Sequence, residues 1–261
     1  MSAEQLSSLR LVLFFSVLPV MVLAESWRPA RPWHDSRSKR LGFHFLLSVF
    51  NSVIYRLIVS APLLALTVYV YDKGWGLAGW LGLRGPAEWI ATFVVMDMFD
   101  YWWHRLNHVV PFFWRFHRGH HYDTHVDAST SLRFHIGELL LSGVMKSLWI
   151  VVWGPSAAAF ALFESGITAY AQFHHSNIDF PDPVEKALRW VHMTPRLHAA
   201  HHTVTIRSRD ANFSTIFLVW DYLFGTFQEA DYEELEKIGI AEGRDRDLSF
   251  AAFLKAPVSL K

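Results

Sequence analysis

Five apolar segments separated by polar loops constrain what this chain can fold into. Hydrophobic residues make up 52% of the 261 residues and charged residues only 18%, which is too apolar for an ordinary soluble domain. A helix needs ~20 apolar residues to cross the hydrocarbon core of a bilayer. The sequence therefore predicts an all-α fold, an integral membrane helical bundle. The predicted membrane segments are 11–24, 41–71, 86–103, 136–153 and 156–173.

Local signals refine this prediction. The segment 41–71 exceeds one bilayer thickness, which predicts a tilted helix or a break near Asn51. Gly154-Pro155 predicts a turn between the last two segments. The first apolar segment resembles the core of a signal peptide, but Glu4 and Arg10 make a poor basic start. We therefore interpret it as a first membrane helix.

Positive charge predicts the orientation of the bundle. The loop 72–85 carries two basic residues, whereas the loop 25–40 carries five, namely Arg28, Arg31, Arg37, Lys39 and Arg40. Because cytoplasmic loops are enriched in Lys and Arg, we expect the loop 25–40 to be cytoplasmic. Counting the spans from there places every histidine-rich segment, and the C-terminus, on the cytoplasmic face. These segments are expected to form a helical cap.

The histidines are concentrated in one part of the chain. Thirteen of the 15 lie between His104 and His202, and many recur at intervals of three or four residues. Residues so spaced share one face of a helix, so each cluster can direct several imidazoles toward one point. Imidazole is the commonest metal ligand in proteins. The clusters predict a metal site that holds more than one ion.

Composition limits the chemistry of this site and its partners. The chain has no cysteine, which excludes disulfides, thiolate zinc sites and Cys-ligated iron–sulfur clusters. The metal ligands must be nitrogen and oxygen atoms, and imidazole suits iron, copper, zinc and nickel alike. The formal net charge of zero does not favour nucleic acid as a partner.

An ordered set of residues between about 90 and 230 resembles the fatty acid hydroxylase and sterol desaturase superfamily. The residues that carry the resemblance are Asp97, Tyr101, Trp102, His104, Arg105, His108, Trp114, His117, His120, His121, Arg133, His135, Glu138, His175, Asn177, Thr194, Pro195, His198, His201, His202, Asn212, Phe213, Trp220, Asp221, Leu223, Phe224, Gly225 and Thr226.

The resemblance implies an integral membrane non-haem di-iron oxygenase that uses O2 to hydroxylate or desaturate a lipid. It implies that two iron ions, or zinc in the protein as isolated, are bound by His104, His108, His117, His120, His121, His175, His198, His201 and His202. His135 occupies a position that the family links to the site, although Ile136 follows it where proline is common. Because the sequence shows no haem-binding extension, we expect a separate protein to donate the electrons. The lipid substrate could be a fatty acyl chain, a sterol, an ether lipid or a carotenoid.

Four carboxylates are candidates to support the metal ligands. Asp97, Asp100 and Asp221 are expected to accept hydrogen bonds from the distal N–H of ligand histidines, which fixes the tautomer of the ring. Asp100 lies one helical turn before His104, which suits this role. Glu138 is expected to act in the same way rather than as a ligand.

Two other functions are compatible with a histidine-rich membrane protein. A zinc hydrolase needs only three protein ligands and an open position for each ion, so this array exceeds its requirement. In a metal transporter or sensor, the ligands should be distributed along the membrane spans rather than gathered at one face of the membrane. The sequence favours the oxygenase. The expected organisation is N-terminal membrane helices over 1–88, a histidine-rich catalytic region over 89–230 and a polar tail over 231–261.

Overall fold

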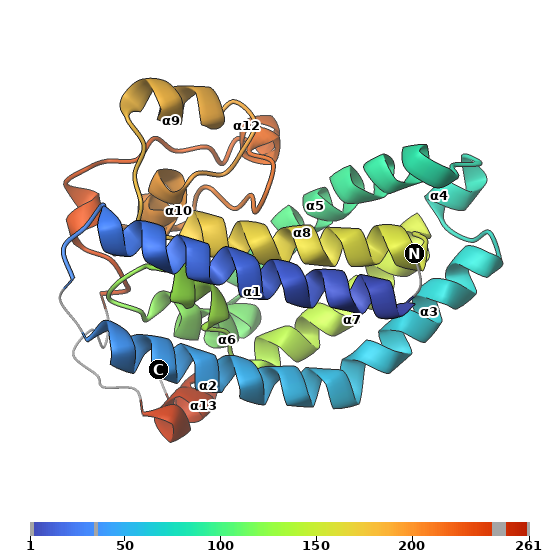
Figure 1. Ribbon diagram of the computed structural model, residues 1–261, viewed down its shortest axis with the longest axis horizontal. Helices are drawn as coiled ribbons and strands as arrows, with labels where there is room; N and C mark the ends of the chain where they lie inside the picture. The colour runs from blue at the N-terminus through green and yellow to red at the C-terminus, as the bar shows by residue number, and fades with distance from the viewer. Residues whose placement is uncertain (1–2, 34–35, 242–248, 260–261) are drawn as a thin grey trace.

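The protein is a helical bundle whose short helices, apart from α4, gather toward one end (Figure 1). The computed structural model describes residues 3–33, 36–241 and 249–259. In these residues regular structure is helical, and extended pairing is limited to two isolated bridges. The long helices are α1 (Ala3–Trp27), α2 (Arg37–Tyr55), α3 (Ala61–Asp72), α5 (Gly85–Val109), α7 (Ile136–Trp153) and α8 (Ala157–His175). The short elements are α4 (Leu77–Trp80), α6 (Pro111–His121), η2 (Ala128–Leu132), α9 (Asp182–Leu188), α10 (Pro195–His201), α11 (Ile206–Arg209), α12 (Val219–Phe224), η3 (Glu234–Glu236) and α13 (Phe250–Ser259).

Helices α2 and α3 form one continuous element that changes direction partway along (Figure 1). The irregularity is a π-helical segment, η1 (Arg56–Ser60), and it lies beyond the expected position near Asn51. Asn51 remains within α2, where its Nδ2 donates to the carbonyl of Phe134 at 2.7 Å. A π-helical turn disrupts the regular hydrogen-bond ladder, which accounts for the bend there.

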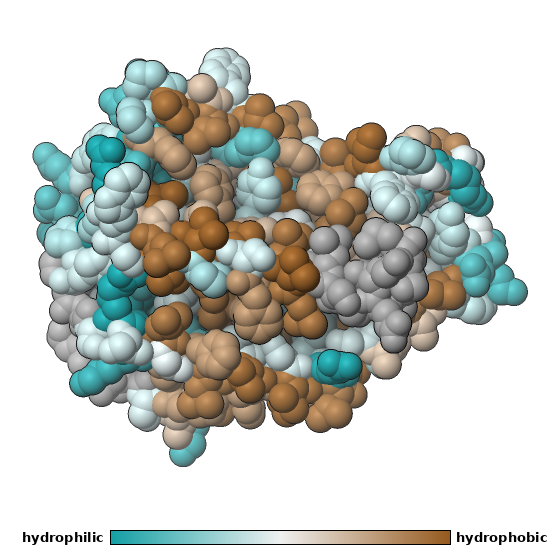
Figure 2. Space-filling view, viewed as in Figure 1, coloured by the Kyte–Doolittle hydropathy of each residue, from teal (hydrophilic) through white to brown (hydrophobic). Residues whose placement is uncertain are grey.

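Two of the expected membrane segments meet the length and hydropathy of a membrane span within the described residues. They are the stretch Arg37–Trp80 and α7. Helix α1 contributes a shorter apolar stretch, Leu11–Trp27. Large apolar side chains are exposed on these helices, and Figure 2 shows a broad hydrophobic area over α1 and α2. Exposed apolar surface of this extent indicates contact with another apolar phase, as a lipid bilayer provides.

The interior of the bundle is closed around α5, α7 and α8. Met96, Ile150 and Phe163, one from each of these helices, belong to one buried apolar cluster. Gly154 ends α7 in the left-handed conformation, as the Gly154-Pro155 signal predicts, and α8 then returns alongside α1 (Figure 1). This return brings the C-terminal end of α8 back to the short helices.

The segment after Ala230 differs from the expected polar tail. Leu235, Ile238, Ile240 and Phe253 are at most 8% exposed, and α13 packs against α6. The apolar residues are interspersed among charged ones, so the composition of the segment hides its packing. Residues 242–248 and 260–261 of this segment lie outside the described residues.

Candidate metal centre

Four elements bring nine histidines together at one end of the bundle. The last turns of α5 carry His104 and His108, and the end of α8 carries His175. The other six histidines lie on α6 and at the end of α10, namely His117, His120, His121, His198, His201 and His202. Helix α10 begins where the sequence predicts, because Thr194 caps it and Pro195 occupies its first position.

The nine histidines form two separate groups. The five-histidine group contains His104, His108, His117, His121 and His201. The four-histidine group contains His120, His175, His198 and His202. Within each group the donor atoms lie within 4.8 Å of one another, so each group could hold a metal ion.

Backbone carbonyls fix the tautomer of several of these rings. The Nδ1 atoms of His120 and His175 lie 3.1 Å and 2.7 Å from the carbonyl oxygens of Arg133 and Ala171. A carbonyl oxygen can only accept a hydrogen bond, so the proton of each neutral ring must reside on Nδ1. The Nε2 atom of each ring then carries a lone pair and no proton.

These lone pairs face one another in the four-histidine group. The Nε2 atoms of His120 and His175 are 3.0 Å apart, and those of His175 and His198 are 2.9 Å apart. Two unprotonated nitrogens repel at this distance unless a cation lies between them. Ligand nitrogens at ~2.1 Å from one ion and at right angles would be separated by about 3.0 Å. The spacing fits a bound metal ion.

The five-histidine group presents unpaired nitrogens to its centre. The Nε2 atoms of His108, His117 and His201 are buried and without a hydrogen-bond partner in the described residues. The Nδ1 atom of His201 donates to the carbonyl of Ala211 at 2.7 Å, so its Nε2 is again unprotonated and has a lone pair that can bind a metal. Buried polar atoms left unpaired are costly. A metal ion that bonds to them removes this cost.

Burial keeps three of the nine rings neutral. It lowers the pKa of His121, His201 and His202 well below 6.5, and neighbouring histidines lower it further. Neutral imidazole is the form that binds metal. At neutral pH these three rings are therefore ready to bind a cation.

Two histidines near the site lie outside both groups. His135 caps α7, where its Nδ1 accepts from Gly137 N at 2.9 Å and its Nε2 lies 3.1 Å from the carbonyl of Leu254. Both of its nitrogens are thus engaged by backbone, unlike those of the nine. The Nδ1 of His174 lies 3.0 Å from the carbonyl of Thr215.

Glu138 lies where a carboxylate can support a ligand. Its Oε1 is 2.8 Å from Nδ1 of His117, and the glutamate is 4% exposed. The ring N–H donates to the carboxylate, which orients the imidazole and increases its basicity.

Asp97, Asp100 and Asp221 differ from the expectation that they bond to the rings. Asp97 accepts from the backbone N–H groups of Ile216 and Phe217. The hydroxyl of Thr215 donates to Asp100 at 2.6 Å.

Asp221 accepts from the backbone N–H groups of Phe213 and Ser214. The three aspartates therefore hold the segment 213–217, and the carbonyl of Phe213 in turn lies 2.8 Å from Nδ1 of His104. Their support reaches the ring through the backbone.

A fifth carboxylate lies beside a ring, and the sequence does not predict it. Oδ1 of Asp210 lies 3.3 Å from Nδ1 of His108 and 3.3 Å from Nε of Arg209. Asp210 stands in a polar turn just after α11, and only the fold brings it to α5. An isolated aspartate beside an arginine carries no signal that would have identified it.

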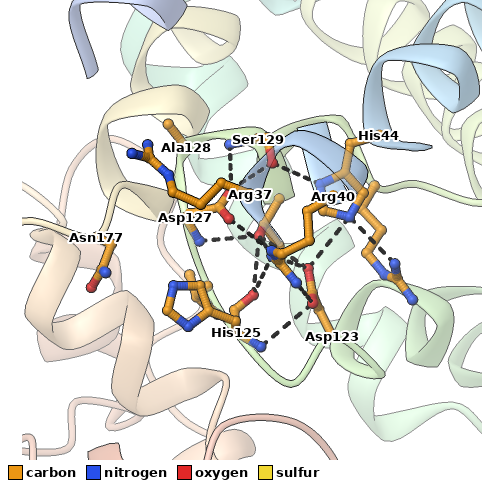
Figure 3. A network of polar contacts seen from close by, with 12 residues as sticks. Arg37, Arg40, His44, Asp123, His125, Asp127, Ala128, Ser129 and Asn177 are labelled. Atoms are coloured by element: carbon orange, nitrogen blue, oxygen red, sulfur yellow. Dashed lines mark hydrogen bonds and ion pairs between the residues drawn. The ribbon is translucent and has the colours of Figure 1, made fainter. Parts of the chain in front are cut away.

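A buried ionic network fixes the loop between α6 and α7. Arg40 of α2 lies between Asp123 and Asp127, with its Nη2 2.9 Å from Asp123 and its Nε 3.0 Å from Asp127 (Figure 3). Arg133 donates to the carbonyl of Gly119 at 3.0 Å. The network thus restrains both ends of this loop. The carbonyl of Arg133, near the end of the loop, orients His120.

Comparison with known proteins identifies the family. A fatty acid hydroxylase family model matches residues 89–226, more than half of the chain and all nine histidines of the two groups. The chain belongs to the fatty acid hydroxylase family. The resemblance seen in the ordered motifs is thereby confirmed.

Relatives in this family have named activities on lipids. Human alkylglycerol monooxygenase is 30% identical over 150 residues, which cover 58% of this chain and 32% of the relative. Ornithine lipid hydroxylase OlsE of Rhizobium tropici is 28% identical over 183 residues, 67% of this chain and 54% of the relative. Methylsterol monooxygenase 1-3 of Arabidopsis thaliana is 26% identical over 224 residues, 83% and 75% respectively.

The chain spans about a third of the length of the alkylglycerol monooxygenases that it matches. No solved structure matches the chain significantly.

Proposed function

We propose that this chain is a membrane-bound, O2-dependent lipid oxygenase whose nine histidines hold two iron ions, one in each group. The observation that carries the proposal is the pair of facing lone pairs on His120 and His175, 3.0 Å apart and buried. That arrangement fits a bound cation, and the second group provides five more donor nitrogens. Family membership and the relatives named as monooxygenases and hydroxylases support iron and a lipid substrate.

The two alternative functions fit this arrangement less well. A zinc hydrolase would use three protein ligands and an open position for each ion, whereas these groups offer four and five. A transporter would need ligands along the membrane helices, whereas the two groups lie at one end of the bundle. The named activities of the relatives also favour oxidation over hydrolysis.

The protein's own residues prepare the site for oxidation of an unreactive C–H bond. Bound iron would supply the activation of O2 and the transfer of electrons. The carbonyls of Arg133, Ala171 and Ala211 hold rings with Nε2 directed toward the metal position. Burial of both groups excludes water, which protects a reactive oxidant from side reactions. The apolar surface of α1 and α2 would place the protein where lipid chains are concentrated.

The overall reaction defines the partners. Hydroxylation inserts one oxygen atom of O2 into the lipid and releases the other as water, which consumes two electrons and two protons. Desaturation removes two hydrogen atoms from the lipid and reduces O2 fully to water with the same supply of electrons. We propose that a separate electron-transfer protein provides these electrons. The substrate is an alkyl or acyl chain, or a sterol, held with its polar end at the membrane surface.

Isotope labelling in a reconstituted system tests this function. Purified protein loaded with iron is placed in vesicles made from lipid extract, with a reducing system and O2 enriched in heavy oxygen. The expected product is a lipid that carries one labelled oxygen atom, or a lipid lighter by two hydrogen atoms. His120→Ala and His201→Ala should insert in the membrane but give no product, whereas His192→Ala, which alters a histidine outside both groups, should remain active. Iron-loaded protein that gives neither product would overturn the proposal.

We also propose that the metal centre and the C-terminus face the cytoplasm. Helix α13 lies against α6, where the carbonyl of Ala256 accepts from Arg118 at 3.0 Å. A reporter fused to the C-terminus therefore reports the side on which the metal groups lie. A cytoplasmic signal is expected from the charge of the loop 25–40, and a signal from the opposite side would overturn the orientation.

A further inference from the structure

The two histidine groups differ in what holds their rings. In the five-histidine group, two rings bond to carboxylates. His117 bonds to Glu138 at 2.8 Å and His108 to Asp210 at 3.3 Å.

The four-histidine group has neutral partners instead. Its rings His120 and His175 bond to backbone carbonyls, and Nδ1 of His198 and of His202 has no partner in the described residues. In the described part of the chain, two of the nine rings bond to a carboxylate, and both of these rings belong to the five-histidine group.

The charges behind the four-histidine group are compensated, because two arginines lie beside two aspartates. Arg133, whose carbonyl orients His120, is 8% exposed, and its Nη1 lies 3.3 Å from Nε2 of His44. Arg40 lies in the same network, so the two guanidinium groups together balance the charges of Asp123 and Asp127 (Figure 3). Glu138, by contrast, has its second oxygen, Oε2, buried and without a hydrogen-bond partner in the described residues. The negative charge beside the five-histidine group is therefore less compensated.

This difference has a direct electronic consequence. A carboxylate that accepts from a ring N–H increases electron donation by the other nitrogen and places negative charge close to the ion. Such charge stabilises the more positive oxidation state, and its effect is largest where water is excluded. An ion in the five-histidine group should therefore hold its ferric state more strongly than an ion in the four-histidine group.

We propose that the two metal positions are unequal in reduction potential, and that Glu138 and Asp210 are the positioning residues that make them so. The inference rests on the proposed function for the identity of the metal. It assigns an order to electron delivery. The first electron from the donor reduces the ion in the four-histidine group, and the ion in the five-histidine group is reduced second.

The two carboxylates should contribute unequally. Glu138 is 4% exposed and lies away from bulk water, so its charge is weakly screened. The Asp210 side chain is 39% exposed and lies 3.3 Å from Nε of Arg209, so water and the guanidinium both reduce its effect. Loss of such a bond typically lowers metal affinity by about 10- to 100-fold. A tenfold difference between the affinities for the two oxidation states corresponds to about 59 mV for a one-electron couple.

Stepwise reduction of the iron-loaded protein, followed by Mössbauer spectroscopy, tests the inference. The proteins to compare are the wild type, Glu138→Gln, Asp210→Asn and Asp179→Asn. Asp179 is a matched control for Asp210, since its side chain is 35% exposed and pairs with Nε of Arg196 at 2.8 Å, but it bonds to no ring of either group. His201→Ala removes a ligand from the five-histidine group alone and so identifies the signal of that ion.

The wild type should show two iron signals reduced at separate potentials, with the five-histidine ion reduced last. In Glu138→Gln the difference between the two reduction potentials should shrink by at least the amount that corresponds to a tenfold difference in affinity. It should shrink by less in Asp210→Asn and not at all in Asp179→Asn. Simultaneous reduction in the wild type, or a gap unchanged by Glu138→Gln, would overturn the inference. If Glu138→Gln does not load iron, Asp210→Asn provides the test. An unchanged difference between the two reduction potentials in that variant would also overturn the inference.

The readout separates this inference from the proposed function. Two iron ions with separate potentials but no oxidised lipid would contradict only the function. An oxidised lipid formed by a protein whose two ions are reduced together would contradict only the inference.

Discussion

Nε of Arg40 lies 3.0 Å from Oδ2 of Asp127, and this ion pair joins the start of α2 to the loop that precedes η2. The same guanidinium bonds to Asp123, so one cation pairs with two carboxylates that are each about 5% exposed or less. Through this loop the N-terminal half of the chain supports the segment that carries His117, His120 and His121. The metal region thus depends on residues far outside the segment that contains the histidines.

Replacement of Arg40 should destabilise the protein strongly. Arg40→Met leaves Asp123 and Asp127 buried without their cation, and breaking a buried pair in this way costs about 3–5 kcal/mol. We expect the midpoint of thermal unfolding in detergent, followed by circular dichroism, to fall well below that of the wild type. Lys39→Met is the matched control, because Lys39 is the neighbouring cation and is exposed. Equal unfolding midpoints for the two variants would contradict the role given to Arg40.

The turn between α7 and α8 should tolerate only glycine at position 154. Gly154 has φ +78°, and a Cβ there would lie 2.0 Å from the carbonyl oxygen of Trp75. Gly154→Ala therefore adds a clash with the backbone to the conformational cost of about 1–2 kcal/mol.

Gly82→Ala isolates the conformational cost, since Gly82 has φ +65° but a Cβ added there would meet no atom within 4 Å. Thermal unfolding of both variants should show the larger loss at Gly154. A loss of stability in Gly82→Ala that equals or exceeds the loss in Gly154→Ala would mean that the close approach of Gly154 and Trp75 is absent.

The cap of α10 should affect both stability and metal retention. The hydroxyl of Thr194 accepts from Leu197 N at 3.3 Å and donates to Glu185 at 2.5 Å. Thr194→Val removes the cap, at a cost of about 1 kcal/mol. It loosens the helix that carries His198 and His201 and ends at its C-cap residue His202.

We expect iron to be released to a chelator faster than from the wild type. Thr205→Val is the control, because Thr205 precedes α11 but makes no capping hydrogen bond. Similar release from both variants would argue against a role for the cap in holding the metal.

The candidate ligand histidines could be proposed from the sequence because helical spacing and side-chain chemistry are both local properties. The nine residues taken from the family pattern are the nine that the fold brings together in two groups. Their division into five and four could not be read in the same way. His120 and His121 are adjacent in sequence, yet they belong to different groups because adjacent residues on a helix point in different directions.

The supporting contacts were harder to anticipate. Asp100 lies one turn before His104, which suggests a bond between them. The fold instead places the carbonyl of Phe213 at Nδ1 of His104 and the hydroxyl of Thr215 at Asp100. Several of the acceptors that fix the rings are backbone carbonyls, such as those of Phe213 and Arg133, and no residue type marks them in a sequence.

Hydropathy predicts long apolar runs but does not detect buried apolar residues that are scattered among polar ones. Helix α7 is found at the residues predicted from its apolar run, 136–153. The tail after Ala230 was misjudged because its few apolar residues, such as Ile238 and Phe253, pack individually rather than as a run.

The most direct test of this account is the iron content of chains in which one histidine group at a time has been disabled. The double variant His108→Ala, His121→Ala alters only the five-histidine group, and His120→Ala, His202→Ala alters only the four-histidine group. After dialysis against a mild chelator, the wild type and the control His192→Ala should retain two iron ions per chain, and each double variant should retain one. A wild type that holds one ion or none, or a double variant that holds as many as the wild type, would contradict the assignment of two separate metal positions.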